Sequence, residues 1–485
     1  MGSVLVLAVV LVPALAAALA FFGGREALRA PLLAGSAVLH LVLVALLWAL
    51  PGAAALGGWL AADGLGLIVL TLISVLFAGV GHYALGFLQG RSARDRRVFN
   101  GGMLAFLAAA SLVALSRHLV LLWVGMEATT LSVAPLIYDR HDRRSLEAVW
   151  KYLVLSSVGI ALALLAVFLL ATAQPSVAGV RPLVLDDLVA GAASLDPWWL
   201  RASFVFAIVG FGTKMGLAPM HTWKPDTYGE APSLVGGLMA GGVTTCAFLG
   251  LARFTQVLVA AGLGGFARPL LIGFGLFSLV VAASFIIGQA DVKRLLAYSS
   301  VEHMGLLALG LGLGGLGTYG AVLHLLNNGL VKGLLFLVVG NLVLAAGSSA
   351  AADLRGMLRA RPASAALVVV GLFAVTGSPP FGLFLSELAI VGGAVRERHP
   401  LVAVLALALL AVIFVGIARM ILEMVLGERP VLPAPQAGQE GPEPRWMILG
   451  PLVLAGLVLM LGSYIPAPLQ EQLARAAVLL GGSPP

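Results

Sequence analysis

An ionisable side chain stands inside an apolar segment at Lys214, in the sequence GFGTKMGLAPMHTWKPD. The segment is interrupted soon afterwards by Gly216 and Pro219, and His221 follows the interruption, where it either caps the break or joins a polar path. A charge at bilayer depth is costly and is usually kept for function. Non-helical backbone is tolerated there only where protein or water satisfies its polar groups. Together these features predict an ion pathway.

A second ionisable residue of this kind is Glu127, which lies in LLWVGMEATTLS with apolar residues for several turns on both sides. A buried carboxylate needs a partner, and a nearby lysine such as Lys214 would supply one and form a proton switch. The alternative is a carboxylate that is hydrogen-bonded for packing alone. Lys151 opens the next apolar segment and is either a further member of the path or a side chain that snorkels to the interface.

Three polar residues share one face of a later apolar helix. His324, Asn328 and Lys332 are spaced at i, i+4 and i+8 in YGAVLHLLNNGLVKGLLFL. At a rise of 1.5 Å per residue, they form a polar file about 12 Å long. A lone histidine is more often a satisfied core residue, but three polar residues in register with a lysine favour a path that orders water and passes protons.

Two further segments carry candidate members of this path. Glu302 and His303, in QADVKRLLAYSSVEHMG, are expected about two turns inside their helix. A second interrupted segment, GSPPFGLFLSELAI, is broken around Pro379 and Pro380 and carries Glu387. Two broken helices in separate halves of a chain indicate structural repeats around a site embedded in the membrane.

The elements that position these residues are predicted to be transmembrane helices. The chain is 60% hydrophobic and 11% charged, with a mean hydropathy of +1.04, which is typical of an all-α polytopic membrane protein. About fourteen apolar segments are each long enough to cross the bilayer, and the first is expected to be a retained span because it lacks signal-peptide features. They lie near 2–22, 31–51, 64–89, 99–116, 119–138, 147–173, 202–222, 232–256, 268–289, 295–313, 317–345, 364–394, 400–426 and 446–464.

Basic residues predict the orientation of these spans. Most Lys and Arg residues fall in loops after odd-numbered spans, and Lys224 and Lys293 are counted among them. Because such loops are usually cytoplasmic, both termini are expected outside. The formal charge of +7 then reflects topology and gives no support for nucleic-acid binding.

The chain is expected to divide into four regions. These are N-terminal helices 1 to 3 (1–98), a first half-channel repeat of helices 4 to 8 (99–256), a second repeat of helices 9 to 13 (257–426), and a C-terminal loop with helix 14 (427–485). The single cysteine, Cys246, excludes an iron–sulfur or CxxC metal pattern. No cofactor or metal is therefore expected in this chain, and any redox chemistry would belong to a partner.

These motifs resemble those of the antiporter-like proton-pumping subunits of respiratory complex I, of group 4 membrane-bound NiFe hydrogenases and of Mrp-type sodium/proton antiporters. The resemblance covers nearly the whole chain and implies a fourteen-span fold with two inverted five-helix repeats, broken helices 7 and 12, and a central polar axis. Its strongest pieces are AADGLG with HYALGFLQG, WVGMEATTLS, TKMGLAPMHTWKPD, DVKRLLAYSSVEHMG, HLLNNGLVKGLLFL and GSPPFGLFLSELAI.

The resemblance also implies roles for individual residues. Glu127 and Lys214 match the paired residues of the first half-channel. His324 and Lys332 match the central relay, and Glu387 matches the residue that ends the axis in helix 12.

Two positions depart from the family pattern. Many members carry a histidine in helix 8 where this chain has Met239, and Asn328 replaces the second histidine of helix 11. The link between Lys214 and Lys332 is therefore expected to rely on water. The sequences KYLVLSSVGIALAL, MAGGVTTCAFLGLARF and SSVEHMG are most similar to the F branch of the hydrogenase-4 membrane components.

The leading hypothesis is a proton-translocating subunit in a prokaryotic cytoplasmic membrane. It would work with other membrane subunits and, through them, with peripheral iron–sulfur/NiFe or NADH-oxidising subunits whose redox events drive it. The alternatives are a secondary sodium/proton antiporter module, an ion-driven subunit of an inorganic-carbon uptake complex, and a scaffold that no longer conducts. Retention of Glu127, Lys214, Lys332 and Glu387 together argues against the scaffold.

Overall fold

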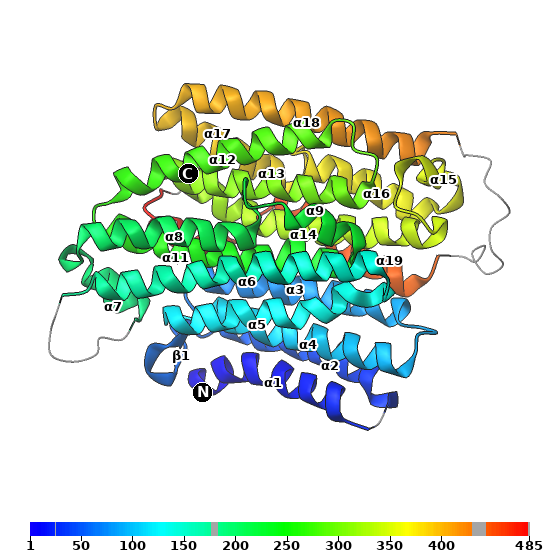
Figure 1. Ribbon diagram of the computed structural model, residues 1–485, viewed down its shortest axis with the longest axis horizontal. Coiled ribbons are helices and arrows are strands. Elements are labelled where there is room, and N and C mark those ends of the chain that lie inside the picture. Colours follow the sequence, from blue (N-terminus) through cyan, green and yellow to red (C-terminus); the bar gives the residue numbers. More distant parts are fainter. Residues whose placement is uncertain (25, 176–182, 429–442, 484–485) are drawn as a thin grey trace.

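The computed structural model describes residues 1–24, 26–175, 183–428 and 443–483, and it is built almost entirely of helices (Figure 1). Residues 429–442, within the predicted C-terminal loop, lie outside the described part of the chain. In the view of Figure 1 the long helices lie side by side, with α1 along one edge of the bundle and α18 along the opposite edge.

The elements of the first half are α1 Gly2–Phe22, α2 Arg29–Trp48, β1 Ala54–Ala55, β2 Leu60–Ala61, α3 Gly64–Phe87, α4 Ala93–Leu115, α5 Leu119–Ile137, α6 Arg143–Thr172, α7 Leu185–Ala190, α8 Pro197–Met215, α9 Trp223–Glu230, α10 Ser233–Leu238 and α11 Thr244–Ala260. The strands β1 and β2 form an antiparallel pair between α2 and α3. A π-helical turn, Met239–Val243, joins α10 to α11.

The elements of the second half are α12 Gly264–Ile286, α13 Val292–Leu313, α14 Gly315–Ala346, α15 Met357–Ala360, α16 Pro362–Val375, α17 Gly382–Arg396, α18 Pro400–Leu426, α19 Arg445–Ser463 and α20 Ala467–Leu479. Short 3-10 turns also occur at Glu26–Leu28, Leu56–Gly58, Tyr138–Arg140, Ala192–Ser194 and Ala351–Leu354.

The spans agree with those predicted from the sequence. Within the described residues, 12 helices are long and apolar enough to cross a membrane, with α10 and α11 counted as one. The two remaining predicted spans are the interrupted ones, α8 with α9 and α16 with α17. The predicted class, a polytopic helical membrane protein with helices 7 and 12 broken, is confirmed.

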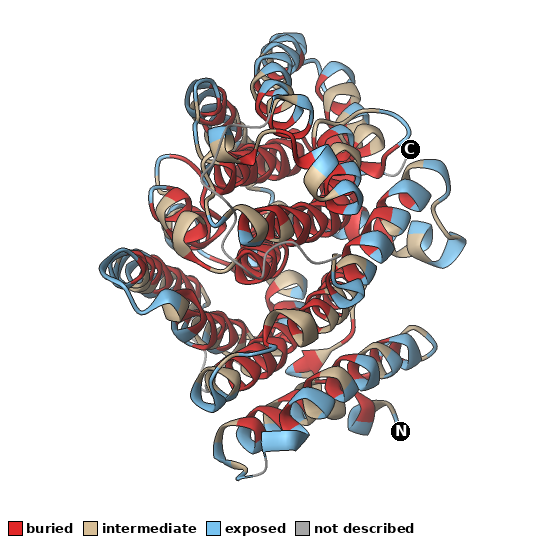
Figure 2. Cartoon of the chain, turned by 90° about the vertical axis from the view of Figure 1, so that its right-hand side faces the viewer, coloured by how far each residue is buried: buried red, intermediate tan, exposed pale blue. Residues whose placement is uncertain are grey.

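The central helices are shielded from the surroundings by the outer ones (Figure 2). In the most apolar 18 residues of the α10–α11 span and of α13, every residue is buried. In the corresponding stretch of α18, only 22% of the residues are buried. Outer helices expose large apolar side chains, among them Leu401, Val404 and Val415 on α18, and such a surface suits a hydrocarbon surrounding. Polar groups on the central helices are therefore separated from lipid.

Both interruptions are built in the same way. Each preceding helix is followed by a glycine with positive φ, Gly216 at 77° and Gly377 at 61°. A proline with a cis peptide bond comes three residues later, at Pro219 and Pro380. Glycine permits the left-handed backbone and proline removes a backbone donor, so the helix cannot continue through either segment.

The two breaks occupy corresponding places in the predicted repeats, since helix 7 is the fourth helix of region 99–256 and helix 12 is the fourth of region 257–426. The division of the chain into four regions itself stays a prediction.

Candidate functional site

Lys214, at the end of the half-helix α8, is fully buried and is held by neutral groups. Its Nζ donates to the Thr130 hydroxyl on α5 at 2.6 Å and to the Tyr152 hydroxyl on α6 at 3.0 Å. The same ammonium lies 4.7 Å from the centre of the Tyr152 ring. Within the described residues, no ion pair includes Lys214.

Glu127 is joined to Lys214 through a hydroxyl, without a direct ion pair. The Thr130 hydroxyl lies 3.4 Å from Glu127 Oε2, and the Ser157 hydroxyl of α6 donates to Oε1 at 3.2 Å. Thr130 follows Glu127 by one turn of α5, so its hydroxyl lies between the carboxylate and the ammonium. Since a hydroxyl both accepts and donates, this first cluster can transmit a proton between the two charged groups.

A second cluster of the same composition surrounds Lys332 on α14. Lys332 Nζ donates to the Ser299 hydroxyl of α13 at 2.7 Å, and that hydroxyl donates to Glu302 Oε2 at 3.2 Å. All three residues are buried. The order along the chain is reversed, because here the hydroxyl precedes the carboxylate by three residues, whereas in the first cluster it follows. Glu302 was predicted only as a candidate member, and the structure brings it to Lys332.

A chain of hydrogen bonds leads away from this second cluster through two histidines. His303 Nδ1 lies 3.0 Å from His324 Nε2, and His324 Nδ1 lies 3.0 Å from the Ser386 hydroxyl of α17. Glu387 is the next residue after Ser386. Among the described residues, His303 Nε2 and Glu387 Oε1 have no hydrogen-bond partner.

The same three ionisable residues are the one set that could hold a metal ion among the described residues. Ligand atoms of His303, His324 and Glu387 all lie within 4.8 Å of one another. Imidazole and carboxylate are suitable ligands for zinc. The hydrogen bond between the two rings, however, is itself an arrangement suited to proton transfer, because each ring nitrogen can accept or donate.

Two departures from the family pattern have distinct surroundings. Asn328 is fully buried between His324 and Lys332 on α14, and neither atom of its amide has a partner among the described residues. Met239 is also fully buried and begins the π-helical turn. The predicted polar file of α14 therefore exists as a row of buried residues, but His324 and Lys332 bond to other helices and not to Asn328.

Two candidate residues lie away from both clusters. Lys151 is partly exposed and pairs with Glu147 at 2.7 Å and with Asp226 at 2.8 Å, beside an open cavity of about 400 Å³. His221 is buried in the first break, with its ring centre 6.3 Å from that of Tyr298 and its Nδ1 without a partner among the described residues. Within the described part of the chain, neither side chain has a hydrogen bond to Lys214 or Lys332.

Two lysines that were assigned to loops are buried within helices α9 and α13, so their placement in loops was wrong. The side of the membrane on which they lie stays a prediction. Lys224 donates to the Ser300 hydroxyl at 3.1 Å. Lys293 donates to the carbonyl oxygens of Gly229 and Ala231 at 2.7 and 2.6 Å, where it caps the end of α9. Both lysines follow helix breaks or turns in the sequence. After the break at Gly216 the chain continues as the buried helix α9, so Lys224 lies in the interior.

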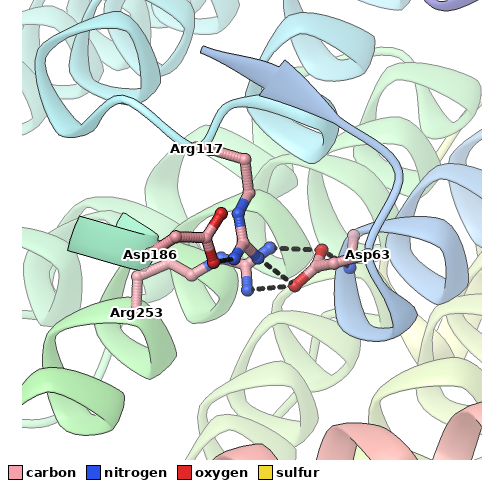
Figure 3. Close-up of polar contacts among 5 residues, drawn as sticks. Asp63, Arg117, Asp186 and Arg253 are labelled. Atoms are coloured by element: carbon pink, nitrogen blue, oxygen red, sulfur yellow. Dashed lines mark hydrogen bonds and ion pairs between the residues drawn. The ribbon is translucent and has the colours of Figure 1, made fainter. Parts of the chain in front are cut away.

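An ionic cluster, which sequence reasoning missed, joins the start of α3, the connection between α4 and α5, and α11 (Figure 3). Asp63 receives two hydrogen bonds of 2.6 Å from Arg253 and one of 2.6 Å from Arg117, which also pairs with Asp186. Burial raises the pKa of the Asp63 carboxyl, but the two guanidinium groups outweigh it, so that the pKa is lowered. The only signal was the position of Asp63 immediately before an apolar helix, where it caps α3.

Comparisons with known proteins identify a family and a relative that this chain matches. Residues 116–414 match the family described as NADH:quinone oxidoreductase/Mrp antiporter, transmembrane. The hydrogenase-4 component F homolog of Methylacidiphilum infernorum is 33% identical over 387 residues, which cover 79% of each chain.

Two solved structures have the same fold. A chain of respiratory complex I from Thermus thermophilus with bound NADH superposes with a TM-score of 0.81 at 25% identity, covering 98% of this chain and 100% of that one. A chain of the Mrp complex from Dietzia sp. DQ12-45-1b superposes with a TM-score of 0.87 at 19% identity, covering 99% of this chain and 97% of that one. The second likeness concerns the fold alone.

Proposed function

Because the chain belongs to the NADH:quinone oxidoreductase/Mrp antiporter family of transmembrane proteins, we propose that it translocates protons as a membrane subunit of a hydrogenase-4-like or complex I-like assembly. The predicted family membership is thereby confirmed. We place the chain in a prokaryotic cytoplasmic membrane with both termini outside, as the distribution of basic residues favours.

The observation that carries this proposal is the way in which the buried lysines are held. Lys214 and Lys332 are fully buried, and their hydrogen bonds go to neutral hydroxyls. When a lysine in an ion pair loses its proton, the carboxylate is left as an unpaired buried charge. When a lysine that is bonded to hydroxyls loses its proton, no such charge is left. Both lysines are therefore suited to take up and release a proton.

The proposed path follows the hydrogen bonds in order. Proton exchange between Glu127 and Lys214 passes through Thr130, and exchange between Glu302 and Lys332 passes through Ser299. From the second cluster the histidine chain leads toward the half-helix that carries Glu387, the proposed end of the axis.

Partner subunits would drive this movement. A hydrogenase-4 component and a complex I chain are among the proteins that this chain resembles, so iron–sulfur/NiFe or NADH-oxidising subunits are the proposed peripheral partners, reached through neighbouring membrane subunits. We assign no cofactor to this chain, whose part in the reaction is to move charge.

A sodium/proton antiporter module is the second candidate, and the family description, which names the Mrp antiporter, favours it. The two candidates differ in their response to sodium. Proton movement that depends on a sodium gradient and needs no electron donor would support the antiporter.

The proposal is tested by Lys214→Ala and Glu127→Ala in the complex purified through this chain. Both variants should assemble with their partners, and both should lose coupled proton transfer in sealed vesicles supplied with the electron donor of the complex. Arg475→Gln, which changes an exposed residue of α20, is the control and should pump normally. Unchanged pumping in both test variants would overturn the proposal.

A further inference from the structure

A third buried lysine, Lys224, lies outside the path described above. It is the second residue of α9 and is fully buried. The one side-chain hydrogen bond of Lys224 within the described part of the chain runs to the Ser300 hydroxyl, and Lys224 takes part in no ion pair there. An ammonium group buried without a counter-charge is costly, so its retention needs a reason.

On one side, the Lys224 side chain contacts the end of the half-helix that carries Lys214. A Cβ built on Gly216 would lie 2.5 Å from both Cδ and Cε of Lys224 and 3.0 Å from its Nζ. Gly216 is the C-terminal cap of α8. The carbonyl groups at a helix C-terminus carry partial negative charge, and they favour a cation at this place. Lys224 and Lys214 are therefore associated with the same helix end.

On the other side, Lys224 reaches α13, the helix whose Ser299 hydroxyl accepts from Lys332. Ser300 accepts from Lys224, and its neighbour Ser299 accepts from Lys332. Adjacent hydroxyls of α13 are thus bonded to different lysines.

The second break has the same design. A Cβ built on Gly377 would lie 2.0 Å from Glu387 Oε2, so an ionisable side chain of the half-helix α17 lies over the positive-φ glycine of its break. Lys224 of α9 lies in the same way over Gly216. Glu387, at the second break, belongs to the proposed path. Lys224 is its counterpart at the first break.

We propose that Lys224 carries the proton between Lys214 and Lys332. This role rests on the proposed function and fills the gap at Met239, which has no group that can hold a proton. In this proposal the Lys214 ammonium gives up one proton to water, and the neutral amine of Lys224 takes up one proton from water. The Lys224 ammonium then gives up one proton at Ser300, and the neutral amine of Lys332 takes up one proton at Ser299, with water between the two hydroxyls. Only N–H and O–H bonds form and break, and no co-reactant is consumed.

The test compares Lys224→Met, Lys224→Arg and Lys224→His in the intact complex. Arginine keeps the positive charge but cannot be deprotonated in proteins. Methionine and arginine should therefore both lower coupled pumping by about 100-fold, the scale of a lost proton-transfer group. Histidine can hold and release a proton near neutral pH, so it should restore part of the rate with a pH profile moved to lower pH.

Lys293→Arg is the matched control, because Lys293 is also a buried lysine next to α9 but donates only to main-chain carbonyls. Arginine can make such bonds, so this variant should pump normally. Full pumping by Lys224→Arg or Lys224→Met would overturn the role of Lys224. If Lys224→Arg and Lys224→Met do not assemble, the test rests on Lys224→His. Full pumping with an unchanged pH profile in that variant would overturn the role of Lys224, and a shifted pH profile would support it. Full pumping by Lys214→Ala would instead show that the proposed function itself fails.

Discussion

Two groups of buried charges are held in opposite ways. In the cluster of Figure 3, Asp63 is bonded directly to Arg117 and Arg253, with three contacts of 2.6 Å. Lys214 and Lys332 are fully buried, but a hydroxyl stands between each lysine and its carboxylate. Direct ion pairs fix protonation states, because a change leaves a buried charge unpaired. Hydroxyl bridges leave the protonation state free to change, so the first group serves structure and the second suits transport.

The variant with the largest expected effect is Lys332→Met, which tests whether the second cluster serves transport. The variant removes the proton-binding group of the second cluster while preserving an unbranched apolar side chain. We expect coupled pumping to fall by about 100-fold or more, while the complex still assembles. The readout is acidification of sealed vesicles per electron transferred, compared with Arg475→Gln.

Pumping at the normal rate by Lys332→Met would place the path elsewhere in the molecule. Loss of assembly would show that Lys332, like the arginines of the Asp63 cluster, is structural.

Asp63→Asn tests the other side of the comparison. It leaves the guanidinium groups of Arg117 and Arg253 buried without their carboxylate, which should destabilise the chain by about 3 to 5 kcal/mol. Because the pKa of Asp63 is lowered in the folded protein, its contribution is complete above the unfolded value of about 4 and is lost as the pH falls through the lowered pKa.

The measurement is the unfolding temperature of the detergent-solubilised complex as a function of pH. Asp63→Asn should unfold at lower temperature, should lack this acid-dependent loss, and should retain its pumping rate per folded complex. A normal unfolding temperature would contradict the structural role of the cluster.

The bridging hydroxyls should have intermediate effects. Ser299→Ala and Thr130→Val each remove one hydroxyl and keep the lysine and the carboxylate. Loss of one hydrogen bond is worth about 1 kcal/mol, so pumping should slow by about fivefold in each variant. We expect the larger loss for Ser299→Ala, because Glu302 is buried while Glu127 is half-buried and has a second hydroxyl partner in Ser157. Equal rates in wild type and both variants would show that the hydroxyls do not transmit the proton.

Met239→His should have the smallest effect. It places a titratable group at the position where the family pattern has a histidine, and the proposed path already has a proton-binding group in Lys224. Pumping should stay within about twofold of the wild-type rate, a change of less than about 0.5 kcal/mol in the barrier. Failure of this variant to assemble would show that the π-helical turn cannot accept a polar ring at this buried position.

The fold could be predicted from the sequence because hydrophobic length and helix-breaking residues are local signals. The bounds of α1 and α18 match the predicted spans 2–22 and 400–426, and the breaks occur at Pro219 and Pro380. The buried ionisable residues were found in the same way, since a charge inside an apolar helix is visible in the chain.

The connections between these residues could not be predicted, because they join distant positions. Arg253 bonds to Asp63 across 190 positions, and Lys214 bonds to Thr130 across 84. Lys224 was misplaced because a lysine after a helix break resembles a loop residue until the path of the backbone is known. Each of these contacts depends on which helices pack together, and the helical pattern alone does not determine that.

The central claim is that buried lysines move protons because neutral hydroxyls hold them. Its most direct test is coupled proton transfer by the purified complex carrying Lys214→Arg or Lys332→Arg, since arginine retains the charge and the hydrogen-bond donors but cannot release a proton. The account predicts assembled complexes that transfer electrons or bind their donor but do not pump. Pumping at the wild-type rate in both variants would contradict it.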